Sequence, residues 1–247
     1  MNKNGLNNTE SIVTEMRAIL LAAGFGTRLK PLTNTIPKCL VPIKGQALLD
    51  IWLQRLSNSH VGPFLINTHY LSEQVEKYIN ASDYGSNSLL VYEAELLGTA
   101  GTLLKNIEFY EGDDGMLIHA DNYCLADFDE FIQSHNKRPK QCLLTMMTFH
   151  TDTPSSCGIV ELDAEGVVVG FHEKVSSPPG NKANGAIYIL SAELLNLIKT
   201  EHPSAKDFST EILPHYLGRI FTYHTYKTFW DIGTPETYAL ANSLTVR

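Results

Sequence analysis

The sequence has 247 residues, of which 43% are hydrophobic and 19% charged, and this length allows one large α/β domain or two small ones. The formal net charge of -8 argues against a nucleic-acid partner, because nucleic acids are bound through concentrated positive charge. No apolar run approaches the ~20 residues that cross a bilayer, so we expect no membrane-spanning segment.

The cysteines and the N-terminal residues indicate the cellular compartment of the protein. The four cysteines are widely spaced and form no C-x-x-C pair, which argues against a zinc site and against a disulfide framework. We therefore expect reduced thiols in a cytoplasmic protein. Residues 1–15 are polar, which is not typical of a signal peptide. They are expected to be a disordered or variable extension, followed by a single domain over residues 16–247.

The first half of the chain alternates short apolar runs with amphipathic segments. This pattern predicts strands at residues 18–22, 63–67, 88–93 and 115–121, and helices at residues 47–57, 72–79 with Ser72 as cap, and 99–107. Such alternation is typical of an α/β fold with a mostly parallel sheet and helices on both faces. In these sheets ligands bind at the carboxyl ends of the strands, so we look for a site there.

The second half is predicted to be richer in strands, at residues 142–149, 158–162, 167–171, 184–190 and 220–224, with a hairpin turn at residues 163–166. Helices are expected from the Ser191 cap to residue 199, from residue 207 to about residue 214, and from Pro235 onward with Thr234 as cap. No internal repeat or low-complexity segment is found.

A glycine-rich turn after the first predicted strand organises the chain. Gly24 and Gly26 allow a sharp turn that presents backbone N–H groups to an anion, and Arg28 and Lys38 add two positive charges. The segment does not match the P-loop pattern. It also lacks the third glycine of the dinucleotide fingerprint, where Leu29 stands. We therefore predict a phosphate-binding loop that does not continue into a helix.

The residues of this turn resemble a known signature. The run LAAGFGTRL at residues 21–29, with PLT at 31–33 and PK at 37–38, is similar to that of sugar-1-phosphate nucleotidyltransferases, also called nucleotide-sugar pyrophosphorylases. The similarity is strongest to short bacterial guanylyltransferases that act on mannose 1-phosphate or D-glycero-D-manno-heptose 1-phosphate. The resemblance implies a three-layer α/β/α Rossmann-like fold of the GT-A type with a mostly parallel mixed sheet. It also implies a nucleotide-binding half at about residues 16–125 and a sugar-phosphate-binding half at about residues 126–247.

The resemblance implies a catalytic set of charged residues. Asp121, at the end of the fourth strand, and Asp231, in the segment FWDIGTPE, match the two aspartates that bind Mg²⁺ in this family. Mg²⁺ prefers one or two carboxylates together with substrate phosphate oxygens, so two aspartates suffice. Lys174 is implied to grip the phosphate of the sugar. Arg28 and Lys38 are implied to contact the nucleotide phosphates and to stabilise the departing pyrophosphate.

The resemblance also implies two groups of binding residues. The expected sugar-binding residues are Asn122, Gly158, Glu173, Asn184 and Gly185, with Glu173 accepting hydrogen bonds from sugar hydroxyls. The expected nucleotide-binding residues are Leu21, Ala22, Ala23, Gly24, Gly26, Thr27, Glu93, Gly98 and Thr99. An ionised glutamate only accepts hydrogen bonds, so Glu93 would suit the N–H edge of guanine. GTP is therefore favoured, and cytosine, uracil and thymine nucleotides stay open, as do mannose, a heptose or an amino sugar.

The expected reaction joins an NTP and a sugar 1-phosphate. An oxygen of the sugar phosphate attacks the α-phosphorus and pyrophosphate leaves, and no general base is needed because a phosphate monoester is already ionised near neutral pH. Accordingly the nine histidines are interpreted as surface residues or as hydrogen-bonded structural residues. The alternatives are an NAD-dependent oxidoreductase, for which Asp50 would be the nearest ribose-binding acid, and a nucleotide-sugar-binding protein without activity. Monomer and homodimer both stay open.

Overall fold

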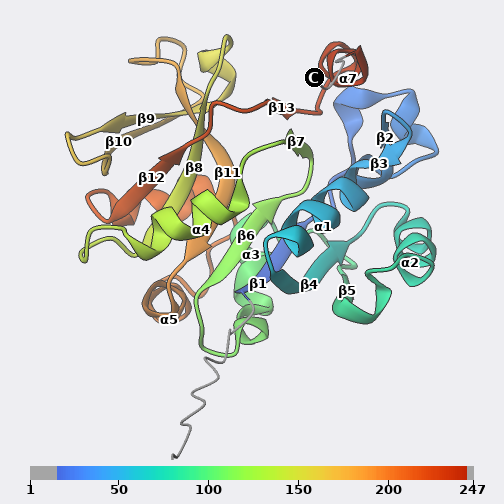
Figure 1. The fold of residues 1–247 in the computed structure, drawn as a ribbon, viewed down its shortest axis with the longest axis horizontal. Helices are drawn as coiled ribbons and strands as arrows, with labels where there is room; N and C mark the ends of the chain where they lie inside the picture. Colours follow the sequence, from blue (N-terminus) through green and yellow to red (C-terminus); the bar gives the residue numbers. More distant parts are fainter. Residues whose placement is uncertain (1–15, 244–247) are drawn as a thin grey trace, which may run out of the picture.

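The computed structural model describes residues 16–243, and the expectation for residues 1–15 lies outside them. Four parallel strands form one side of a nine-stranded sheet (Figure 1), in the order β5-β4-β1-β6 with β5 at the edge. Their bounds are β1 Met16–Leu21, β4 Val61–Thr68, β5 Ser88–Tyr92 and β6 Gly115–His119. These are the four strands predicted from the apolar runs of the first half, with ends shifted by a few residues.

The remaining strands extend this sheet in mixed orientation. The strand β11 (Lys182–Leu190) runs antiparallel to β6 and continues the sheet into the second half of the chain. Around it lie β8 Leu144–His150, β9 Gly158–Leu162, β10 Val168–Glu173 and β12 Ile220–His224. Of these, β12 pairs with β8 in parallel, whereas β8 and β9 pair with β11 antiparallel. The predicted mixed α/β sheet is thereby confirmed.

Helices cover both faces of the sheet, because each has one apolar side to bury. On one face the buried core contains side chains from α1 Leu48–Asn58, α2 Ser72–Asn80, α4 Phe128–Asn136 and α7 Pro235–Ser243. On the other face it contains side chains from α3 Thr99–Lys105, α5 Ala192–Glu201 and α6 Phe208–Glu211. The three-layer arrangement expected from the sequence is therefore present.

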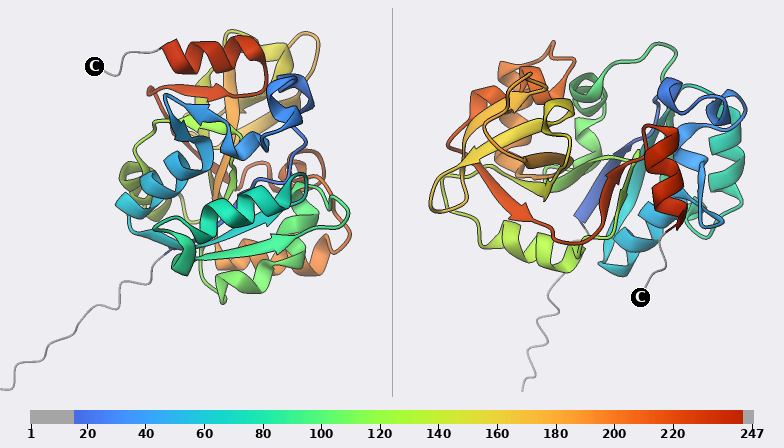
Figure 2. Two further views of the ribbon diagram at one scale, coloured as in Figure 1. Left: turned by 90° about the vertical axis from the view of Figure 1, so that its right-hand side faces the viewer. Right: turned by 90° about the horizontal axis from the view of Figure 1, so that it is seen from above.

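Two short ribbons lie outside the main sheet and bring distant segments together. One pairs β2 (Pro42–Ile43) with β3 (Gln46–Ala47), and the other pairs β7 (Asn122–Cys124) with β13 (Phe229–Asp231). The helix α7 follows β13 and lies beside β2 and β3 (Figures 1 and 2). The last part of the described chain thus returns to the first half, next to the segment that follows β1.

The local sequence signals were confirmed at some helix ends and wrong at others. The Ser191 hydroxyl accepts from the backbone N–H of Leu194, as expected of a cap. Ser72 is not a cap, because it is the first helical residue and follows Leu71, which has φ 52°. The helix α3 ends at Lys105 rather than at residue 107. Within residues 16–243, no helix combines the length and apolar character needed to cross a membrane.

Candidate active site

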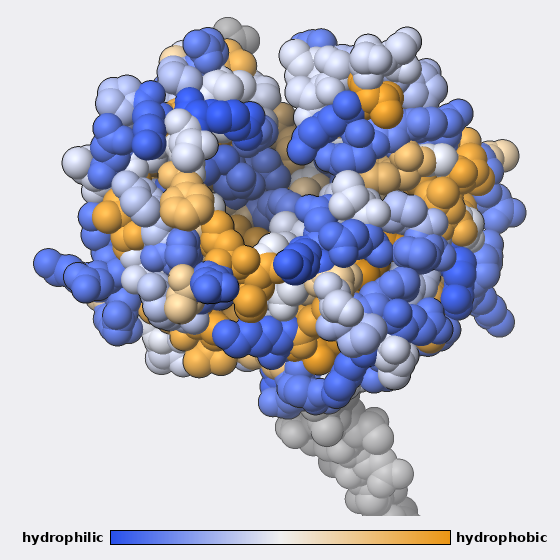
Figure 3. Space-filling view, turned by 180° about the vertical axis from the view of Figure 1, so that it is seen from behind, coloured by the Kyte–Doolittle hydropathy of each residue, from blue (hydrophilic) through white to orange (hydrophobic). Residues whose placement is uncertain are grey.

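Two pockets meet at the carboxyl ends of the central strands. The first, between the glycine-rich turn and the start of α3, is lined by residues that include Ala22, Gly24, Lys38, Asn67, Glu93, Gly98 and Thr99. The second, in the second half of the chain, is lined by residues that include Asn122, Cys157, Glu173, Lys174, Asn184, Gly185 and Asp231. His119 and Asp121 border both pockets. In the space-filling view the molecule is hollowed, with hydrophilic residues around the depression (Figure 3).

The glycine-rich turn is held in a defined shape beside the first pocket. Gly26 has φ 63°, a region that glycine adopts without strain. A Cβ there would lie 2.8 Å from Cγ2 of Thr33, whose hydroxyl donates to the Gly26 carbonyl at 2.7 Å. Between β1 and β2 the described chain forms only short 3-10 turns, so the prediction that no α-helix follows the turn is confirmed.

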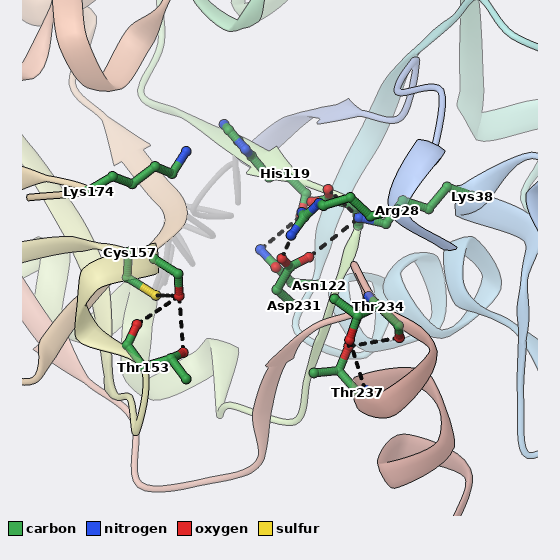
Figure 4. A network of polar contacts seen from close by, with 12 residues as sticks. Arg28, Lys38, His119, Asn122, Thr153, Cys157, Lys174, Asp231, Thr234 and Thr237 are labelled. Atoms are coloured by element: carbon green, nitrogen blue, oxygen red, sulfur yellow. Dashed lines mark hydrogen bonds and ion pairs between the residues drawn. The ribbon is translucent and has the colours of Figure 1, made fainter. Parts of the chain in front are cut away.

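Four of the five predicted catalytic residues form one charged cluster (Figure 4). The Nζ of Lys38 lies 2.7 Å from Oδ2 of Asp121 and 3.4 Å from Oδ1 of Asp231. Arg28 Nη2 lies 3.1 Å from the other oxygen of Asp231. Lys38 is only 6% exposed, so its charge is poorly screened by water. One ammonium group therefore holds both predicted metal-binding carboxylates.

This cluster sets the charge of Asp121. Burial acts to raise the pKa of the Asp121 carboxyl, but the Lys38 ammonium and its hydrogen bond outweigh burial and hold the pKa below its usual range. Asp121 is therefore ionised at neutral pH, as a ligand for a cation must be. The β7–β13 ribbon positions the two aspartates, since Asp231 pairs with Asn122 and the N–H of Ile232 donates to the Asp121 carbonyl at 3.1 Å.

Gly233 makes room for the Arg28–Asp231 ion pair, and the sequence analysis did not single it out. A Cβ at this position would lie 2.7 Å from Arg28 Nη2 and 2.7 Å from Asp231 Oδ2. Both distances are shorter than any real Cβ contact, so a side chain here would displace the pair. The signal in the sequence was a glycine two residues after the predicted metal-binding aspartate.

A buried polar network forms the inner wall of the first pocket. Glu93 is 1% exposed, and its Oε1 accepts from the Asn67 amide at 3.0 Å and from the Thr102 hydroxyl. Its Oε2 accepts from the N–H of Leu97 at 3.2 Å. Asn67 also accepts from the N–H of Ala22 at 2.7 Å, which ties the end of β1 to Glu93. Asn67 is a pocket residue that sequence reasoning missed, because only its position at the end of β4 pointed to it.

Gly98 and Thr99 at the start of α3 pack against the segment before α6. Gly98 has φ 79°, and a Cβ there would collide with the carbonyl oxygen of Lys206. The Thr99 hydroxyl accepts from the N–H of Phe208 at 2.7 Å. Both residues line the first pocket, as do Leu21, Ala22, Ala23 and Gly24. Gly26 and Thr27 lie in the turn but are not among the lining residues.

Lys174 and Glu173, the residues implied to contact the sugar phosphate and the sugar, both line the second pocket. Lys174 has φ 50°, and its Nζ lies 3.2 Å from Oε1 of Glu173. Gly158 supports this pair, because a Cβ there would lie 2.5 Å from Glu173 Oε2 and 2.7 Å from the ring of Phe171. Lys174 directly follows β10, and its side chain extends toward His119, apart from the Lys38 cluster (Figure 4).

The amides of Asn122 and Asn184 are bonded to the protein itself. Asn122 donates to the carbonyl of Gly185 at 3.3 Å, and Asn184 donates to the Tyr188 hydroxyl at 2.6 Å. The side-chain oxygen of Asn184, Oδ1, accepts from the N–H of Ala186 at 2.9 Å. These contacts shape the floor of the second pocket, and direct contact of the amides with a sugar stays a prediction.

The interpretation of the histidines as surface or hydrogen-bonded residues is wrong for His119, whose Nε2 is buried without a hydrogen-bond partner among the described residues. Nε2 of His224 is also buried without a partner among these residues, but the Nδ1 of that ring lies 3.1 Å from the Thr148 hydroxyl. Burial lowers the pKa of His119 from its ordinary value. His135 fits the expectation, because its ring contacts Thr145 and Asp114. Burial of a ring nitrogen depends on packing between strands, and sequence spacing cannot show it.

In residues 16–243 no three His, Cys, Asp or Glu side chains are arranged to hold a metal ion. The candidate ligands are the two carboxylates of Asp121 and Asp231. The ribose-binding acid of the oxidoreductase alternative is not supported, since Asp50 lies in α1 and accepts a hydrogen bond from Gln46 at 2.7 Å. The arrangement is instead a cluster of two cations and two carboxylates next to two adjoining pockets.

Residues 17–246 match the family model described as nucleotidyl transferase, and the chain therefore belongs to this family. It is 31% identical over 228 residues to the mannose-1-phosphate guanylyltransferase catalytic subunit beta of Drosophila melanogaster, which covers 90% of this chain and 60% of that protein. It is 30% identical over 252 residues to a glucose-1-phosphate adenylyltransferase of Desulfitobacterium hafniense, with 92% of this chain and 63% of that protein covered.

A solved structure is also similar over nearly its full length. The crystal structure of HddC from Yersinia pseudotuberculosis complexed with GMP-PN has a TM-score of 0.75 and 25% sequence identity, over 92% of this chain and 98% of HddC. This chain spans about three fifths of the length of the curated relatives it matches. The family resemblance seen in the glycine-rich turn is confirmed.

Proposed function

We propose that the protein transfers a nucleoside monophosphate from an NTP, preferably GTP, to a sugar 1-phosphate, giving an NDP-sugar and pyrophosphate. The observation that carries this proposal is the position of the Lys38–Asp121–Asp231–Arg28 cluster where two pockets meet. The first pocket would take the nucleotide and the second the sugar phosphate. The names of the relatives, which include guanylyl- and adenylyltransferases, support the reaction class.

The residues present fit a magnesium ion. Asp121 and Asp231 are close enough to share the Lys38 ammonium, and both approach it through carboxylate oxygens, the ligands that Mg²⁺ prefers. When bound, Mg²⁺ would neutralise phosphate charge at the α-phosphorus. Lys38 would then leave the carboxylates and contact the nucleotide phosphates. Asp121 and Asp231 would hold the ion, with the remaining ligands supplied by phosphate oxygens.

The main task of the protein's residues would be to bring two polyanions, the NTP and the sugar 1-phosphate, together. At ~4 Å two like unit charges repel by roughly 4 kcal/mol at an effective dielectric constant of 20. Lys174, on the far side of the hollow, would hold the incoming sugar phosphate in line with the α-phosphorus. Arg28 and the N–H groups of the turn would stabilise the charge that grows on the departing pyrophosphate. Positioning and charge neutralisation supply the rate in such reactions.

Glu93 supports the preference for GTP. Its carboxylate borders the first pocket, is buried, and has no cationic partner among the described ion pairs. Oε2 accepts one hydrogen bond, from Leu97, so this oxygen has a further lone pair. The edge of guanine that carries N1–H and the amino group offers donors to such an oxygen, whereas a carbonyl-rich edge would be repelled.

A screen of pyrophosphate release tests the proposal. Purified protein with Mg²⁺ is incubated with each of four NTPs against mannose, heptose, glucose and glucosamine 1-phosphates. We expect release with GTP and at least one of these sugar phosphates, and no release without the sugar phosphate. Saturable binding of a nucleotide sugar with no release from any pair would instead favour the binding-protein alternative.

A further inference from the structure

The ring of His119 stands at the boundary between the two pockets. His119 ends β6, and it shares with Asp121 the property of lining both pockets. Its Nε2 is buried and has no hydrogen-bond partner in residues 16–243. Buried polar atoms are nearly always paired, because an unpaired one loses its bonds to water without replacement. A pocket-lining ring that lacks a partner in the protein points to a partner in the ligand.

The surroundings of the ring indicate which ligand group it suits. His119 and Lys174 extend toward each other from opposite sides of the hollow (Figure 4). Lys38 and Lys174 already supply positive charge for phosphate oxygens. A neutral imidazole has one donor and one acceptor, which matches a hydroxyl group. The second side-chain torsion of histidine is broad, so Nε2 would reach a ligand by rotation of the ring about this torsion.

We propose that His119 forms a hydrogen bond with a substrate hydroxyl at the boundary of the two pockets, and that this bond helps to select the substrate. The inference rests on the proposed transfer reaction, which places an NTP in one pocket and a sugar 1-phosphate in the other. Two substrate parts carry hydroxyl groups there, the ribose of the nucleotide and the ring of the sugar. The chemistry is the same in both cases, and deoxy analogues distinguish them.

His224 offers a matched control. Its Nε2 is also buried without a partner in residues 16–243, and its Nδ1 contacts the Thr148 hydroxyl, but His224 lies on β12 and borders neither pocket. His119→Phe removes a buried ring nitrogen at the boundary between the two pockets, and His224→Phe removes a buried ring nitrogen away from both pockets. His119→Asn keeps a donor and an acceptor and serves as the rescue variant. Thermal unfolding shows whether each variant folds, and His119→Leu replaces the phenylalanine variant if that one does not.

The measurement compares intact and deoxy substrates at saturating Mg²⁺. The kcat and KM values are determined with GTP, 2′-deoxy-GTP and 3′-deoxy-GTP, and with the preferred sugar 1-phosphate and its deoxy analogues. In the wild type, loss of the contacted hydroxyl should lower kcat/KM about 3- to 10-fold, mainly through KM. His119→Phe should have the lowered kcat/KM already with the intact substrate, and the deoxy analogue should not lower it further. His119→Asn should recover part of the lost kcat/KM, and His224→Phe should have the kcat/KM of the wild type.

The outcomes separate cleanly. Loss of discrimination against ribose analogues assigns the contact to the nucleotide, and loss against sugar analogues assigns it to the acceptor; either supports the inference. Equal discrimination by wild type and His119→Phe for every analogue would overturn it while leaving the transfer reaction intact. No pyrophosphate release by the wild type with any pair would overturn the proposed function, and this inference with it.

Discussion

Arg28 and Asp231 are 203 residues apart in the sequence and form an ion pair of 3.1 Å, in which Asp231 lines the second pocket. Both side chains are partly exposed, so the pair itself adds little to stability. Its significance is positional, because it places a guanidinium group beside the carboxylate proposed to bind the metal. Predictions about this pair therefore concern activity rather than folding.

Replacing Arg28 by alanine should lower kcat by on the order of 10²–10³, comparable to losing one preorganised donor at a developing negative charge. Lys30→Ala is the matched control, because Lys30 is an exposed cation in the same turn and, unlike Arg28, takes part in none of the ion pairs of the described residues. Steady-state pyrophosphate release and thermal unfolding are measured for both variants. Near-normal kcat in Arg28→Ala would remove this side chain from the proposed mechanism.

Gly233→Ala tests whether the geometry of the pair matters. The added methyl group would lie 2.7 Å from both Arg28 Nη2 and Asp231 Oδ2, so one of the two must move. Displacement of catalytic groups by about 1 Å can cost up to ~10²-fold, and we expect kcat to fall about 10-fold or more. Gly180→Ala is the control, since a Cβ there meets no atom within 4 Å. Equal kcat values for the two variants would contradict the prediction.

Asp231→Asn should weaken the affinity of the enzyme for Mg²⁺. An amide oxygen is a poorer ligand for a hard cation than a carboxylate, and the variant loses one negative charge at the proposed site. We expect the Mg²⁺ concentration at half-maximal activity to rise about 10-fold or more, following the loss of an interaction worth at least ~1.4 kcal/mol. Asp83→Asn, at an exposed position outside both pockets, is the control. Superimposable Mg²⁺ titrations of Asp231→Asn and wild type would reject the assigned role.

The order of elements was readable from the sequence because each depends on local periodicity. The buried run of β6 and the cap at Ser191 are local features of this kind. The roles of Arg28 and Lys38 could be predicted because both residues belong to a short motif that is typical of one protein family. The division into a nucleotide-binding half and a sugar-binding half stays a prediction. The strand β13, from the second half, pairs with β7 from the first half.

The contacts between segments that are distant in the sequence could not be predicted from local sequence patterns. Lys38 and Asp231 are separated by 193 residues, so only the fold shows that one amine contacts both aspartates. The roles of Gly233 and Asn67 likewise depend on partners that are remote in the sequence. His119 was assigned to the wrong class because its burial is produced by neighbouring strands. The sequence therefore indicated most of the candidate residues, and the fold shows which of them lie together.

The stability of the protein should depend on pH through His224. Burial, with smaller effects from Lys182 and His150, lowers the pKa of His224 to about 4, against about 6.5 in an unfolded chain. Between these values the folded protein binds fewer protons than the unfolded chain, so its stability rises with pH in this window. The stabilisation is complete above about pH 6.5 and is lost as the pH falls toward about 4.

His224→Gln removes this titration while keeping a polar side chain of similar size, and urea unfolding at pH 7.5 and pH 5 measures the effect. Because the His224 side chain is partly exposed, solvent screening reduces the effect to on the order of 1 kcal/mol. We expect the wild type to lose about that much more unfolding free energy than the variant on acidification. Histidines that do not contact His224 titrate equally in both proteins, so the difference isolates His224 and the ring of His150 that packs against it. Parallel losses in the two proteins would show that this ring does not contribute to the acid sensitivity.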